Sequence, residues 1–120
     1  KKKQVFKSIK KIGRDIKKNW SRIAKKNNID IEIFGKDSIP QFKFKVSNQI
    51  YKTYLTQEML KENILASNTI YVSIAHKAKI LQKYYKNLEQ IFYKISKTNI
   101  KKIKSDIKGD IAHSEINRLN

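Results

Sequence analysis

The sequence predicts an α+β fold, with a small antiparallel sheet of about three strands and helices packed on one face of it. Two segments, 4–27 and 80–95, space their apolar residues three and four apart, which places them in one stripe on a helix. Two short runs, 29–34 and 41–46, alternate apolar and polar residues as half-buried strands do. The predicted order is helix, strand, strand, helix, strand, helix. It would leave the second sheet face polar, or in contact with another domain.

A first helix is expected over residues 4–27. Lysines cover the faces outside its apolar stripe, and Asn27 and Asn28 follow its last apolar residue. Asparagine is the usual substitute for glycine in the left-handed conformation that ends a helix. The apolar stripe consists of Val5, Phe6, Ile9, Ile12, Ile16, Trp20, Ile23 and Ala24.

The runs 29–34 and 41–46 are expected to pair as antiparallel neighbours, because the residues between them are rich in turn formers. Phe42 and Phe44 fall on one face of the second run, and lysines fall on the other. This separation of rings and charges favours a core strand over a base-stacking platform with interleaved cations.

A second helix is expected after the hairpin, with Ser47 or Asn48 as its N-cap and Asn63 as its left-handed stop. Its apolar residues are Ile50, Tyr54, Leu55 and Met59. A third strand is expected at 69–74, where β-branched and aromatic residues predominate.

A long third helix completes the predicted core. Its apolar stripe consists of Ile80, Leu81, Tyr84, Leu88, Ile91, Phe92 and Ile95. The tail, 97–120, is lysine-rich and weakly periodic, so it is expected to be extended or partly helical. One short helix is expected around 100–107, and Gly109 interrupts the last segment.

Composition restricts the functions that this chain can carry. Its 120 residues suit a single domain, 1–120, and the lack of cysteine excludes disulfides and thiolate sites. No apolar run approaches the ~20 residues that span a bilayer. The net charge of +18 would suit nucleic acid, but the arginines that best bind phosphates and guanine edges are few: Arg14, Arg22 and Arg118. We therefore interpret the charge as a solvated surface without a specific nucleic-acid or membrane partner. The alternative is a lysine-rich nucleic-acid-binding module; a peripheral membrane helix fits less well, because its apolar stripe is needed for the core.

No catalytic or metal-binding motif stands out. His76 and His113 do not lie at metal-ligand spacing, the isolated glycines form no phosphate-binding loop, and no glycine-flanked serine forms a nucleophile elbow. Glu58 and Glu62 lie one helical turn apart near Lys61. We interpret them as a solvated helix face and not as a general acid/base pair.

Three stretches of the chain carry a resemblance: YLTQEMLKENILASN at 54–68, IYVSIAH at 70–76 and IAHSEINRL at 111–119. They resemble the C-terminal domain of class III pyridoxal-phosphate-dependent aminotransferases of the glutamate-1-semialdehyde 2,1-aminomutase-like branch. That family shows a Thr-Gln-Glu-Met-Leu-Lys helix, a glycine stop, a strand ending in Ser-x-x-His, and a closing His-Ser-Gly-Phe-x-Arg-Leu. Gly13 and Trp20 stand where the family's bridging helix carries similar residues.

The chain departs from this pattern at several positions. Asn28 and Asn63 replace glycines, which asparagine's tolerance of left-handed backbone angles permits. Lys77 stands where a threonine often follows the histidine. Asn68 occupies the place where aminomutases proper usually carry a glutamate, which favours an aminotransferase-like relative.

The resemblance implies a cytoplasmic, homodimeric enzyme whose large domain holds pyridoxal phosphate through a lysine and an aspartate. This chain would be the C-terminal fragment, inactive alone and without cofactor, catalytic or metal residues of its own. Its missing partner would be the large domain, and its role would be to close the substrate cleft. The loop Ser67, Asn68 and Thr69 is the candidate substrate-binding segment, with a plain connecting turn as the alternative. His76 and His113 are expected to be structural.

Overall fold

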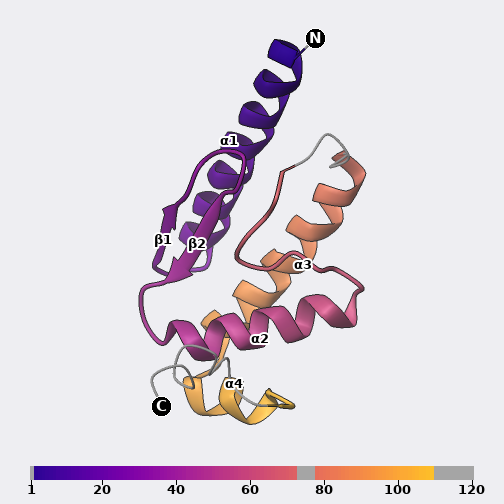
Figure 1. The fold of residues 1–120 in the computed structure, drawn as a ribbon. Coiled ribbons are helices and arrows are strands. Elements are labelled where there is room, and N and C mark those ends of the chain that lie inside the picture. The colour runs from indigo at the N-terminus through magenta and orange to yellow at the C-terminus, as the bar shows by residue number, and fades with distance from the viewer. Residues whose placement is uncertain (1, 73–77, 110–120) are drawn as a thin grey trace, which may run out of the picture.

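The computed structural model describes residues 2–72 and 78–109, and these form an α+β fold, as the sequence predicts (Figure 1). In chain order the elements are α1 (Lys2–Lys26), β1 (Ile31–Phe34), β2 (Gln41–Phe44), α2 (Asn48–Lys61), α3 (Ala78–Lys97) and α4 (Ile100–Asp106). Within these residues no helix combines the length and apolar character needed to cross a membrane.

Helix α1 provides one wall of the core. Ile16, Trp20 and Ile23 are fully buried, and they lie on the apolar stripe that the sequence predicts. The helix ends as expected, because Asn28 adopts a left-handed φ of 55°. The side-chain amide of Asn27 also donates a hydrogen bond to the Ile23 carbonyl oxygen, 2.9 Å away, in addition to the bond that this oxygen accepts from the Asn27 backbone N–H.

The connection between the two strands is tied onto α1. Lys17 Nζ donates to the Gly35 carbonyl oxygen at 2.6 Å and lies 3.2 Å from Asp37 Oδ1. A Cβ atom at Gly13 would lie 1.8 Å from the Asp37 carbonyl oxygen. The loop can approach the helix this closely because position 13 has no side chain.

Strands β1 and β2 pair antiparallel, with Ile31 opposite Phe44 and Ile33 opposite Phe42. Phe42 and Phe44 are buried, whereas Lys43 is exposed, so the prediction of a core strand is confirmed. Their rings contact aromatic side chains of three helices: Phe42 meets Trp20 of α1 and Phe92 of α3, and Phe44 meets Tyr51 of α2 and Phe92, with centroid distances of 4.8 to 5.9 Å. The helices therefore cover this inner face of the sheet (Figure 1).

The third strand predicted at 69–74 is reduced to a single bridge between Gln41 and Thr69 in the described residues. The backbone still runs beside the residues that precede β2: Ile70 N–H donates to the Pro40 carbonyl at 3.1 Å, and Val72 N–H donates to the Ser38 carbonyl at 3.0 Å. Pro40 has no N–H to return the next ladder bond, which explains why the pairing is not a regular strand. Residues 73 and 74 lie outside the described part of the chain.

The remaining helices follow the predicted pattern with one correction. Asn63 ends α2 in a left-handed conformation (φ 59°), as predicted. Ser47 is the N-cap residue, but it is itself left-handed and its side chain makes no capping hydrogen bond. Asn48 does not cap either: its Oδ1 accepts from the Phe44 N–H at 3.0 Å and secures the end of β2. The short helix expected around 100–107 is α4, capped by Asn99, whose side chain accepts from the Lys102 N–H. The part of the tail beyond residue 109 lies outside the described residues.

Candidate functional site

The predicted loop Ser67, Asn68 and Thr69 lies along β2, and its backbone is held there by hydrogen bonds. The Asn68 carbonyl accepts from the Phe42 N–H at 2.9 Å, and the Asn68 side-chain amide donates to the Phe42 carbonyl at 3.0 Å. Ser67 Oγ donates to Asn68 Oδ1 at 3.2 Å. Asn68 therefore ties the loop to the sheet. The side chains of Ser67 and Asn68 both form hydrogen bonds, whereas that of Thr69 forms none with another described residue.

A buried tyrosine holds the loop from its other side. Trp20 Nε1 donates to the Tyr84 hydroxyl at 2.9 Å, and that hydroxyl donates to the Ser67 carbonyl oxygen at 2.5 Å. Tyr84 is 2% exposed, and its burial raises the pKa of the phenol above its ordinary value of 10.0, although the hydrogen bond from Trp20 acts in the opposite direction. The hydroxyl therefore stays protonated and links α1, α3 and the loop.

This arrangement predicts a pH-dependent effect of Tyr84→Phe. The variant leaves the Trp20 N–H and the Ser67 carbonyl unpaired, so we expect it to lower the free energy of unfolding by about 2 kcal/mol near neutral pH. The unfolded chain loses the Tyr84 proton near pH 10, whereas the folded protein keeps it to higher pH. The stabilisation by Tyr84 is thus intact below about pH 10 and declines above it by up to about 1.4 kcal/mol per pH unit.

Urea unfolding of both proteins at rising pH measures this effect. The gap between the wild type and Tyr84→Phe should narrow above about pH 10. Tyr93→Phe is the matched control on the same helix, because Tyr93 is 57% exposed and its loss should cost less than about 0.5 kcal/mol. A gap that stays constant across the alkaline range would contradict the buried, protonated hydroxyl.

Thr69 lies on the open face of the sheet, opposite the helices. Phe34 pairs with Gln41, and Gln41 pairs with Thr69, so the three side chains form a row across this face. Tyr71 points the same way, since it is 71% exposed between the buried residues Ile70 and Val72. Phe34, at one end of the row, and Tyr71 thus leave aromatic surface exposed on this face.

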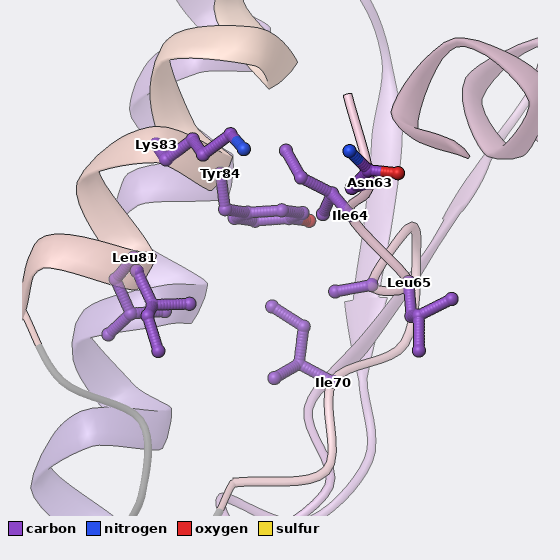
Figure 2. Close-up of a pocket in the computed structure, with 9 residues that line it drawn as sticks. Asn63, Ile64, Leu65, Ile70, Leu81, Lys83 and Tyr84 are labelled. Atoms are coloured by element: carbon purple, nitrogen blue, oxygen red, sulfur yellow. The ribbon is translucent and has the colours of Figure 1, made fainter. Parts of the chain in front are cut away.

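A cavity of about 430 Å³ opens beside the same loop, between the segment that follows α2 and the first turns of α3 (Figure 2). Ala66 and Ile70, which flank the loop, line this cavity, but Ser67, Asn68 and Thr69 do not. Its walls are mostly aliphatic, with the ring of Tyr84 on one side. In Figure 2, the side chain of Lys83 points from α3 toward Ile64.

From the sequence, Glu58 and Glu62 are interpreted as a solvated helix face and not as a general acid/base pair. Glu58 Oε2 is engaged by Lys61 Nζ at 2.7 Å, and this hydrogen bond is the main cause of the raised pKa of Lys61. Glu62 is exposed at the end of α2. No cluster of His, Cys, Asp or Glu that could hold a metal occurs in residues 2–72 and 78–109. His76 and His113 lie outside the described residues.

The sequence predicted a connecting loop at 67–69 but not the groups that hold it. It placed Tyr84 on a helix stripe, where its hydroxyl partners lie 17 and 64 residues away in the chain. It also missed the cavity, because its walls come from the ends of two helices and the segment between them. No periodicity carries such information, since both features depend on the packing of distant segments.

Comparison of the chain with models of protein families, with curated proteins and with solved structures found no match.

Proposed function

We propose that this chain is the C-terminal small domain of a class III pyridoxal-phosphate-dependent aminotransferase of the glutamate-1-semialdehyde aminomutase-like branch, and that it closes the substrate cleft against a large domain. The arrangement of the resembling stretch supports this proposal. Residues 54–72 form the end of α2, a left-handed stop at Asn63, the loop, and an extended segment along β2. The resemblance implies this order of helix, stop and loop, followed by a strand; in the described residues that strand is the single bridge at Thr69.

The open sheet face is the surface on which the large domain would pack. Helices cover the inner face, whereas Phe34 and Tyr71 remain 39% and 71% exposed on the outer one. Thr69 lies in the row that contains Phe34, so packing on this face would bring Thr69 to the boundary between the two domains. In this proposal Thr69 contacts the substrate directly, and Asn68 positions it by clasping the loop to β2.

In our proposal this chain contributes no cofactor site. The reactive lysine of such an enzyme must lose its proton, but the pKa of Lys61 is raised above its ordinary value by the hydrogen bond to Glu58. Lys83 lines the cavity of Figure 2. The described residues that line this cavity with Lys83 include no carboxylate that could pair with a pyridine nitrogen. In our proposal the large domain therefore supplies the whole cofactor site.

Borohydride trapping tests whether the large domain, and not this chain, holds the cofactor. The 120-residue chain and a longer protein that includes the upstream coding sequence are each incubated with pyridoxal phosphate, reduced, and mapped by mass spectrometry. We expect one trapped cofactor per longer chain, on a lysine upstream of Lys1, and none in stoichiometric amount on the 120-residue chain. Stoichiometric trapping on a lysine of the 120-residue chain would refute the proposal, as would an upstream sequence without a cofactor lysine and aspartate.

The role of the loop is tested in the longer protein with Thr69→Arg. We expect this variant to keep its bound cofactor and to raise KM for the amino substrate about tenfold, which corresponds to ~1.4 kcal/mol of lost binding. Thr98→Arg is the matched control, because it makes the same substitution outside the loop. Thr98 lies after α3, and its hydroxyl donates to the Lys94 carbonyl. Equal kinetics for the two variants would remove Thr69 from the substrate site.

One observation favours a second function, polyanion binding. Helix α1 carries a row of exposed basic side chains at spacings of three and four, so that they share one face: Lys11, Arg14, Lys18, Arg22 and Lys25. This row is about 21 Å long. Tight duplex binding with a steep salt dependence and a sequence preference would favour this second function. Weak binding that disappears at physiological salt is what a net charge of +18 produces on any fold.

A further inference from the structure

The cavity of Figure 2 has the size and walls of a small-ligand site. Its volume of about 430 Å³ falls in the range typical of such sites, which are mostly apolar with a few polar groups. The aliphatic wall residues are Ile64, Leu65, Ala66, Ile70, Ile80 and Leu81. Two of them are large side chains left in solvent at the edge: Leu65 is 88% exposed and Ile80 is 56% exposed. An apolar ligand would cover surface that is now in contact with water.

The polar groups of the cavity favour an anion. Lys83 and Asn63 supply an ammonium and an amide at its edge, and the described lining residues include no carboxylate. Lys83 forms no ion pair with another residue of the described segments. The Tyr84 hydroxyl is already engaged by Trp20 and Ser67, so Tyr84 presents only its ring to the cavity. A cation that has no ion-pair partner among the described residues and that lies beside apolar walls complements a monoanion with an apolar body.

We propose that this cavity binds a medium-chain aliphatic carboxylate. The alkyl chain would lie between Ile70, Leu81 and the ring of Tyr84, and the carboxylate would accept hydrogen bonds from Lys83 Nζ and from the Asn63 amide. This inference does not depend on the proposed function, because it concerns the α3 side of the loop and not the open sheet face.

Chain length distinguishes a cavity from general attraction to a cationic protein. The series from acetate to decanoate is titrated into the 120-residue chain, and binding is followed by calorimetry and by tryptophan fluorescence. Trp20 is the single tryptophan, and it donates a hydrogen bond to Tyr84, which lines the cavity. We expect the affinity to rise about fourfold per added methylene and to level off once the cavity is full. Equal binding across the series would overturn the proposal, since the net charge of +18 attracts every carboxylate alike.

Two substitutions locate the ligand. Lys83→Gln should lower the affinity for octanoate about tenfold and leave that for octanol unchanged, because the lost contact is a charge-assisted hydrogen bond. The matched control is Lys86→Gln, an exposed lysine on α3 that does not line the cavity, which should change neither affinity more than about twofold. Equal losses in the two variants would overturn the assignment of Lys83.

Ala66→Phe fills the cavity and should abolish the binding of both octanoate and octanol. Circular dichroism verifies that this variant is folded. Octanoate binding that persists in the folded Ala66→Phe protein would place the ligand elsewhere and overturn the proposal.

Discussion

Gly13→Ala should destabilise the protein by about 3 kcal/mol, although alanine is the better helix former. The new Cβ would lie 1.8 Å from the Asp37 carbonyl oxygen and 2.6 Å from its carbon, which are backbone atoms and cannot rotate away. The loop is also tied to α1 by Lys17, so it must either break those contacts or bend the helix. Urea unfolding followed by circular dichroism measures the loss.

The sign of this effect separates two explanations. In an exposed helix, replacing glycine with alanine gains about 1 kcal/mol, so helix propensity alone predicts a more stable protein. Gly109→Ala is the matched control, because a Cβ there meets nothing within 4 Å. We expect Gly109→Ala to change stability by less than about 0.5 kcal/mol. A Gly13→Ala protein as stable as the wild type would contradict the close approach of the loop to α1.

Trp20→Ala should cost about 4 kcal/mol, which is a large share of the stability of a domain of this size. Trp20 is fully buried, its ring lies 4.8 Å from that of Phe42, and its N–H donates to Tyr84. The variant therefore opens a cavity between α1 and β2 and removes the donor to the hydroxyl that holds the loop at Ser67. Chemical unfolding followed by circular dichroism measures the loss, since the variant has no tryptophan fluorescence.

Trp20→Phe divides this cost into its parts. Phenylalanine keeps most of the ring packing but cannot donate to Tyr84, so we expect a loss intermediate between wild type and Trp20→Ala. Tyr93→Ala is the control for removing an aromatic residue from an exposed position, and it should cost less than about 1 kcal/mol. A Trp20→Ala protein that loses no more than this control would contradict the position of Trp20 at the centre of the core.

Both of these predictions concern residues of α1 that the resemblance also singled out. Gly13 allows the hairpin connection to touch the helix, and Trp20 joins the helix to β2 and α3. Packing thus explains why these residue types occur at positions 13 and 20, without a direct role for either residue in catalysis. In our proposal α1 therefore provides the rigid support on which the open face and its loop are built.

The sequence by itself determined the elements whose signals are local. Apolar spacing predicted the stripe of α1 and that of α3 from Leu81 to Ile95, but it wrongly included Ile80, which is 56% exposed. Alternation predicted the inward faces of Phe42 and Phe44, and Asn28 and Asn63 marked helix ends. These features depend on the fixed period of a helix or strand, or on the backbone preference of one residue, so a short window of sequence contains them.

The tertiary structure alone decided what depends on distant segments. The segment at 69–72 has strand-like residues, but its partner presents Pro40, so it forms one bridge to Gln41 and no regular strand. The loop after α2 is held by Tyr84 and Phe42, and the cavity beside it arises from the way α3 meets that segment. Hydrogen-bond partners and cavities are set by which surfaces meet in space, and no local pattern specifies that meeting.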